Sequence, residues 1–132
     1  MQPALSADIS YPTNLGRLNE ARVHTEKIID ILYKQLKGQI QKKPITYRNV
    51  ARKDYLLIAK QRRPSRNKKR QAIKKQLQYI KRNLAHLEQL IDSGATLKGL
   101  NKKQYKTRLV LTEVYRQQQW LFDNEKQSIE GG

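Results

Sequence analysis

The sequence predicts an all-α protein, a bundle of about four helices in which two long helices run antiparallel. Apolar residues recur at helical spacing in four segments, which are separated by short stretches containing glycine or proline. No segment shows the βαβ pattern or the string of hairpins that would indicate a sheet. The predicted helices cover 14–37, 46–62, 65–93 and 102–128, in one domain over 14–132 that follows an extended stub and turn over 1–13.

Capping residues define the ends of the first two helices. Asn14 is a favourable N-cap, and Gly38 stands where a helix commonly ends in the left-handed conformation. Thr46 is predicted to cap the second helix, because its hydroxyl can accept a backbone N–H. Pro64 ends that helix, since proline disfavours the helical conformation of the residue before it.

The third helix has the clearest periodicity. Ser65 is its predicted N-cap and Gly94 ends it, so it spans about 43 Å at ~1.5 Å per residue. Its apolar residues are four and three positions apart in turn, which is a heptad seam. Three neighbouring amphipathic helices favour packing of this seam inside the bundle over a coiled coil between chains. The seam consists of Ile73, Leu77, Ile80, Leu84, Leu87 and Ile91.

The fourth helix has a broader apolar face. Trp120 is expected to anchor its last turns in the bundle. The predicted face consists of Tyr105, Leu109, Thr112, Val114, Tyr115, Leu121 and Phe122.

Composition restricts the kinds of site that the chain can carry. Of its 132 residues 37% are hydrophobic, so the core is expected to be narrow. Cysteine is absent, which excludes a disulfide framework and a thiolate metal site. No window approaches the ~18 apolar residues of a membrane span, and no signal peptide follows Met1, so we expect a soluble protein.

Positive charge is concentrated in the middle of the chain. Lys and Arg number 28 against 11 acids, for a net charge of +17. Residues 41–82 contain sixteen of these bases and a single acid, Asp54, so the flanking segments are close to neutral. The charge therefore forms a patch and not a general bias.

Such a patch on a helix–turn–helix corner is typical of contacts to the phosphates of nucleic acids, and a nucleic acid is the expected partner. A solvated basic face and an anionic membrane surface are the alternatives. The membrane is disfavoured because the neighbouring apolar residues are needed for the core. Phosphate contacts give affinity without base selection. The predicted nucleic-acid-binding residues are Lys60, Arg62, Arg63, Arg66, Lys68, Lys69, Arg70, Lys74, Lys75 and Arg82.

Several tyrosines are interleaved with the basic residues. Stacking on single-stranded bases is one role for them. Half-buried packing with a solvated hydroxyl is the role that their helical spacing favours. The tyrosines concerned are Tyr47, Tyr55, Tyr79, Tyr105 and Tyr115.

Catalytic and metal-binding patterns are missing from the sequence. The aspartates are scattered over different segments, and His24 and His86 stand alone on helices. There is no metal-ligand spacing, glycine-rich phosphate loop or nucleophile elbow. We therefore expect no catalytic residue, no bound metal, no cofactor and no small-molecule substrate in this chain.

Several ordered motifs resemble a known family. Together they resemble the middle of a bacterial insertion-sequence transposase of the DDE type, whose catalytic domain is RNase H-like. The motifs, in chain order, are "ADISYPTNLGRLNEAR", "EKIIDILYKQL", "KDYLLIAKQRRPSRNKKRQAIKKQLQYIKRNL" and "VYRQQQWLFDN".

The resemblance implies that the chain is a helical insertion. In the family a strand ends at the first catalytic aspartate, in a pattern similar to D-A-T-x-x-P-x-D-I-x-Y-P-T-D-L. Aligning Asp8, Tyr11 and Pro12 to that pattern puts the catalytic aspartate at Met1, and Asn14 replaces a later aspartate. The intact family enzyme uses Mg²⁺ or Mn²⁺ held by three carboxylates. None of the three is matched here, so this chain alone is expected not to catalyse strand transfer.

The expected function is therefore DNA backbone binding by a truncated transposase segment, in the bacterial cytoplasm and associated with the nucleoid when bound. A free-standing nucleic-acid-binding regulator and a coiled-coil adaptor are the alternatives. Self-association and binding to the remainder of a transposase stay open as further partner interactions.

Overall fold

The computed structural model describes residues 15–40 and 42–131, with side chains described as far as Asn124. The predicted stub over 1–13 and the Asn14 cap lie outside the described residues. Within the described residues the predicted all-α bundle is confirmed. Its elements are α2 (Leu15–Gln35), α3 (Arg48–Ala59), α4 (Arg66–Asp92), the short 3₁₀ helix η1 (Leu97–Gly99) and α5 (Lys102–Gly131).

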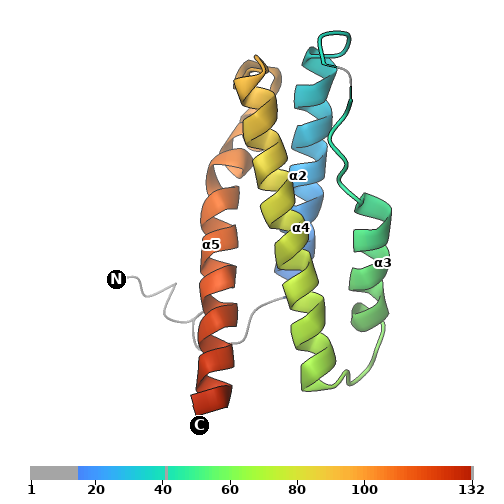
Figure 1. Cartoon of the computed structure of the whole chain (residues 1–132), viewed down its shortest axis with the longest axis vertical. Coiled ribbons are helices and arrows are strands. Elements are labelled where there is room, and N and C mark those ends of the chain that lie inside the picture. The colour runs from blue at the N-terminus through green and yellow to red at the C-terminus, as the bar shows by residue number, and fades with distance from the viewer. Residues whose placement is uncertain (1–14, 41, 132) are drawn as a thin grey trace.

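The helices alternate in direction along the chain (Figure 1). The two long helices α4 and α5 are antiparallel, as predicted: Arg70 near the start of α4 contacts Phe122, while Glu88 near its end contacts Arg108. The most extensive packing, however, joins α4 to α2, which runs parallel to it. α3 lies on one side of this central pair and α5 on the other (Figure 1).

Both predicted ends of α4 are confirmed, at Ser65 and Gly94, whereas α2 ends at Gln35 and not at the predicted residue 37. The Ser65 hydroxyl accepts a hydrogen bond from the Lys68 backbone N–H at 3.1 Å, which caps α4. Gly38 and Gly94 have φ angles of +94° and +114°. These left-handed conformations let the chain leave α2 and α4 with little strain, since glycine lacks a Cβ.

The predicted limits of the second helix are wrong at both ends. Helix α3 starts at Arg48, and its N-cap is Tyr47, with φ of +55° and no side-chain capping bond. The Thr46 hydroxyl is buried and accepts from Arg48 Nε at 3.2 Å, so it is not used as a cap. The helix ends at Ala59, and residues 60–65 form the turn in which the chain reverses direction before α4.

The heptad seam of α4 lies in the core of the bundle. Ile73, Leu77, Ile80 and Leu87 are at most 5% exposed, and the seam's other two residues are partly buried against the same cluster. Helices α2 and α5 cover it. The seam is therefore used within the chain and is not presented to a partner.

The apolar face predicted for α5 is only partly correct. Leu121 and Phe122 are buried in the core, but Tyr105 and Leu109 are 43% and 53% exposed. Trp120, the predicted anchor, is 54% exposed, so that prediction is wrong. The reason is that α5 contacts the bundle along one side only, and these three side chains lie on its outer side.

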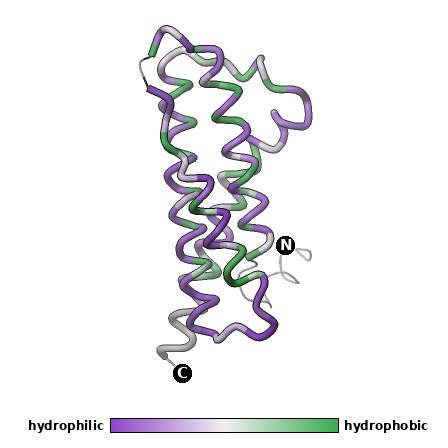
Figure 2. Tube along the Cα trace, turned by 90° about the vertical axis from the view of Figure 1, so that its right-hand side faces the viewer, coloured by the Kyte–Doolittle hydropathy of each residue, from purple (hydrophilic) through white to green (hydrophobic). Residues whose placement is uncertain are grey.

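Hydropathy follows the same arrangement. Along each helix, hydrophobic and hydrophilic residues alternate instead of forming one long apolar stretch (Figure 2). The turn between α3 and α4 is hydrophilic throughout. Among the described helices, none combines the length and the apolar character needed to cross a membrane.

Candidate nucleic-acid interface

The turn between α3 and α4 brings six predicted cations to one end of the bundle. All six are exposed, and within the described part of the chain none has a side-chain hydrogen bond or an ion pair. Their charges are thus not neutralised by any residue in the described part of the chain. This group, the basic corner, consists of Lys60, Arg62, Arg63, Arg66, Lys68 and Lys69.

The position of the corner follows from local structure. Pro64 and the Ser65 cap fix the start of α4, so that the first-turn residues Arg66 and Lys68 surround a helix N-terminus. The unpaired N–H groups of a helix N-terminus carry a partial positive charge. The corner therefore combines side-chain and backbone attraction for an anion.

Three further predicted cations continue along the outer side of α4. Lys74 and Lys75 are exposed, and Lys74 lies on the side toward α5. Arg82 is also exposed, but its guanidinium lies over the Tyr47 ring at 5.0 Å from the centroid. Arg82 thus helps to hold the segment that precedes α3.

Arg70 differs from the other nine predicted residues. It is half-buried, its guanidinium lies 4.1 Å from the centroid of the Phe122 ring, and Nη2 donates to the Phe122 carbonyl at 3.5 Å. Its Nη1 is buried and has no hydrogen-bond partner among the described residues. Arg70 therefore connects α4 to α5, a role that its place in a basic run did not indicate.

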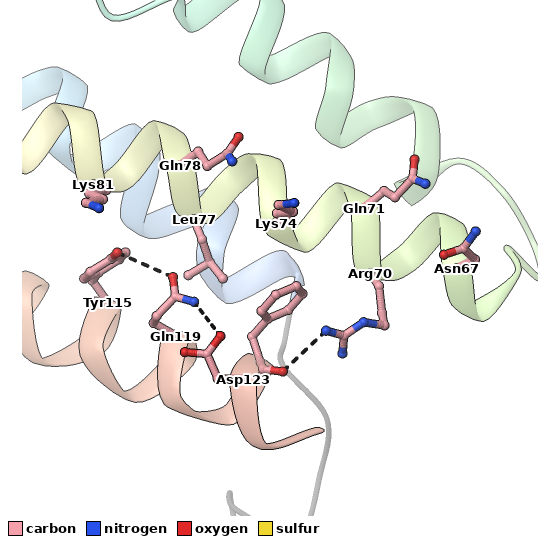
Figure 3. Close-up of a pocket in the computed structure, with 11 residues that line it drawn as sticks. Asn67, Arg70, Gln71, Lys74, Leu77, Gln78, Lys81, Tyr115, Gln119 and Asp123 are labelled. Atoms are coloured by element: carbon pink, nitrogen blue, oxygen red, sulfur yellow. Dashed lines mark hydrogen bonds between the residues drawn. The ribbon is translucent and has the colours of Figure 1, made fainter. Parts of the chain in front are cut away.

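A groove of about 600 Å³ lies between α4 and α5 beside the basic corner (Figure 3). Arg70, Lys74 and Lys81 line it from α4. Lys81, which was not among the predicted site residues, lies two helical turns beyond Lys74 on the same side. The three cations form one row along the groove.

The α5 wall of the groove is a chain of polar side chains. The Tyr115 hydroxyl donates to Gln119 Oε1 at 3.4 Å, and Gln119 Nε2 donates to Asp123 Oδ1 at 3.0 Å (Figure 3). Burial, with a smaller effect of the Asp123 charge, raises the pKa of Tyr115. Asp123 is the acid of the groove lining.

Asp54, the single acid of the basic stretch, bonds a neutral partner. The Tyr79 hydroxyl donates to Asp54 Oδ2 at 2.6 Å. Burial and, next, this hydrogen bond raise the pKa of Tyr79 to about 12. Asp54 thus forms a structural α3–α4 contact and no ion pair with the corner, as far as the described residues extend.

Sequence reasoning missed a buried polar network between α2 and α4. Arg22 is 1% exposed; it pairs with Glu26, and its Nε donates to Gln76 Oε1 at 2.8 Å. Gln76 in turn donates to the Ala51 carbonyl of α3 at 3.0 Å. The sequence does contain an indication that Arg22 is buried: it lies four residues after the core residue Leu18, on the apolar face of α2.

The two histidines and the acids do not form a metal centre in the described part of the chain. No group of three or more potential ligands occurs there. His86 Nε2 donates to the Ile45 carbonyl at 3.1 Å. The described residues thus do not form the three-carboxylate set that the transposase resemblance implies for Mg²⁺ or Mn²⁺.

Comparison of the chain with protein-family models, with curated proteins and with solved structures gives no match.

Proposed function

We propose that the protein binds the backbone of duplex DNA through its basic corner. The observation that supports this most directly is the exposure of six cations around the α4 N-terminus, with no acid paired to any of them among the described residues. Such cations displace the counterions condensed on DNA, which makes binding favourable and strongly dependent on salt. Contacts of this kind carry no base specificity.

We propose further that this DNA binding serves transposition, with the chain as a helical part of a transposase that is catalytically incomplete alone. This assignment is supported by the resemblance of the four sequence motifs. The remainder of the transposase would then be a partner. A free-standing regulator would use the same corner but would not need that partner.

The coiled-coil adaptor is less well supported, because its seam lies in the core under α2 and α5. An adaptor should form a dimer whose fraction rises with concentration. Sedimentation velocity at two concentrations measures this directly. A monomer at both concentrations is the expected result.

The DNA-binding proposal is tested with the variant Arg62→Gln, Arg63→Gln, Lys68→Gln, Lys69→Gln. Arg70 is left intact because it packs on Phe122. We expect duplex affinity to fall by more than about 100-fold at low salt, and the slope of log K against log salt to decrease by about 3 to 4. Fluorescence anisotropy of a labelled duplex measures both quantities.

A matched control also removes four positive charges, but at the opposite end of the bundle. The variant Lys34→Gln, Lys37→Gln, Lys98→Gln, Lys103→Gln alters four exposed side chains near the turns at that end. It should lower affinity far less than the corner variant. Equal losses in the two variants would show that net charge alone attracts DNA, and would reject the role of the corner.

A further inference from the structure

The groove between α4 and α5 has the composition of an anion site. Lys74 and Lys81 are exposed, and the described residues include no acid paired with either. At ~1.5 Å per residue, Arg70 and Lys74 are about 6 Å apart along the helix axis, and Lys81 follows after about 10 Å. The groove thus presents a row of positive charges on one wall.

Arg70 is the first cation of this row, and its guanidinium is held in position by contacts with α5. Stacking on Phe122 and the bond to the Phe122 carbonyl hold the guanidinium in place (Figure 3). Its Nη1 has no acceptor in the described part of the chain, which is an unfavourable state for a buried donor. A bound anion would lower that cost by balancing the charge of the guanidinium.

The dimensions of the groove restrict its occupant. A volume of about 600 Å³ is typical of pockets for small ligands. A whole duplex is far wider than a slot between two packed helices. Phosphate groups along one strand can enter it, whereas the aromatic faces offer little for base stacking, since Arg70 already covers the Phe122 ring.

We infer that this groove seats phosphate groups of one DNA strand, so that bound DNA lies across α4 toward α5 and not across α3. The inference builds on the proposed function, because it states where the phosphates lie once DNA is bound. The carboxylate of Asp123 lies on the α5 wall of the groove and repels a bound phosphate. The attraction of the cations on α4 must exceed this repulsion.

The first test compares two pairs of cations with duplex DNA as the probe. The groove pair is Lys74→Gln, Lys81→Gln, and the control pair is Arg52→Gln, Lys53→Gln on the exposed side of α3. We expect the groove pair to lower affinity at least about tenfold and to reduce the salt slope by about 2. The α3 pair should change both quantities much less.

The second test removes the repelling charge. Asp123→Asn keeps an acceptor for Gln119, and it should tighten duplex binding about two- to threefold. Glu113→Gln is the matched control, since Glu113 is an exposed α5 acid outside the groove lining that pairs with Arg116. Equal effects of the two substitutions would contradict the groove assignment.

The third test uses inorganic phosphate alone and is read by NMR. Titration should shift the backbone amide resonances of Arg70, Lys74 and Gln119 in the wild type, and not in the groove pair. If the wild type binds duplex DNA and the groove pair behaves as the α3 pair, the inference fails and the proposed function stands. If the wild type does not bind duplex DNA, the proposed function fails, and the phosphate titration alone decides whether the groove is an anion site.

Discussion

Arg22 and the arginines of the basic corner share one chemistry and have opposite environments. Arg22 is 1% exposed, and its guanidinium is bonded to Glu26, Gln76 and Asn19. Arg62 and Arg63 are exposed and have no acid partner among the described residues. The hydrogen-bonding groups of Arg22 are occupied by residues of the core. Those of Arg62 and Arg63 are exposed to solvent. Charge alone therefore does not distinguish an arginine that stabilises the fold from one that is exposed to solvent, whereas burial and pairing do.

Arg48 lies between these extremes. Its Nη1 and Nη2 donate to the two Asp30 oxygens at 2.9 and 2.7 Å, and both side chains are more than a third exposed. Lys43 also contacts Asp30, at 2.5 Å. The forked pair joins the start of α3 to α2, and Lys43 joins the segment before α3 to the same carboxylate.

The largest effect is expected for Arg22→Met. The substitution leaves Glu26 as an unpaired buried charge and removes the donor to Gln76 Oε1. The free energy of unfolding should fall by about 3–5 kcal/mol, the usual result of removing one partner of a buried ion pair. Urea unfolding followed by circular dichroism measures it. A loss below about 1 kcal/mol would show that the network is not needed for stability.

A double variant, Arg22→Met with Glu26→Leu, sharpens this result. Removing both charges leaves no uncompensated ion, so much of the lost stability should return. Failure to recover would indicate that Arg22 acts mainly through Gln76 and the link to α3.

An intermediate effect is expected for Asp30→Asn. It removes the forked pair with Arg48, and the free energy of unfolding at neutral pH should fall by about 1 kcal/mol, since the pair is partly exposed. Burial by itself raises the pKa of Asp30, but the hydrogen bonds and charges of Arg48 and Lys43 outweigh it and hold the pKa below 3.8.

The sign of the pH dependence follows from that lowered pKa. A carboxyl with a depressed pKa stabilises the folded state above its unfolded-state pKa, and this stability is lost as the pH falls through the folded-state pKa. The difference between wild type and Asp30→Asn should therefore be constant near neutral pH and shrink below about pH 4. A difference that stays constant in acid would mean that the ion pair is not its cause.

The smallest effect on stability is expected at the basic corner. Arg62→Gln with Arg63→Gln should change the free energy of unfolding by no more than about 0.5 kcal/mol, because the exposed side chains have no described partner to lose. Thermal unfolding at matched salt measures it. A large loss would show that the corner has a structural role.

Much of the secondary structure was predictable because its signals are local. Ser65 caps α4 through its own hydroxyl, and Gly38 and Gly94 take left-handed conformations that other residues adopt reluctantly. The heptad seam required a buried partner, and the core provides one. The caps depend on residues close in the chain, and the seam is a local pattern whose burial is completed by α2 and α5.

Other features could not be read from neighbouring residues. Thr46 is a good cap by type, but its hydroxyl bonds the side chain of Arg48, which is held by Asp30 from α2. Trp120 is a strong core former by type, yet it lies on the outer side of α5. Both outcomes depend on which helix sides face the bundle.

In the candidate site, too, some features could be predicted from the sequence and others depended on packing. The concentration of cations in 41–82 was evident from composition, and it led to ten predicted residues. Packing then separated Arg70, which contacts Phe122 52 residues away, from the exposed members of the set. It also added Lys81, which lines the groove with residues of α5.

The all-α class, the caps of α4 and the location of the positive charge could be read from the sequence, because periodicity, capping and charge are properties of short segments. The central pairing of α2 with α4, the burial of Arg22 and the groove between α4 and α5 became visible in the folded chain. Burial and pairing depend on contacts between residues far apart in the chain, and no short segment contains the free energy of such contacts.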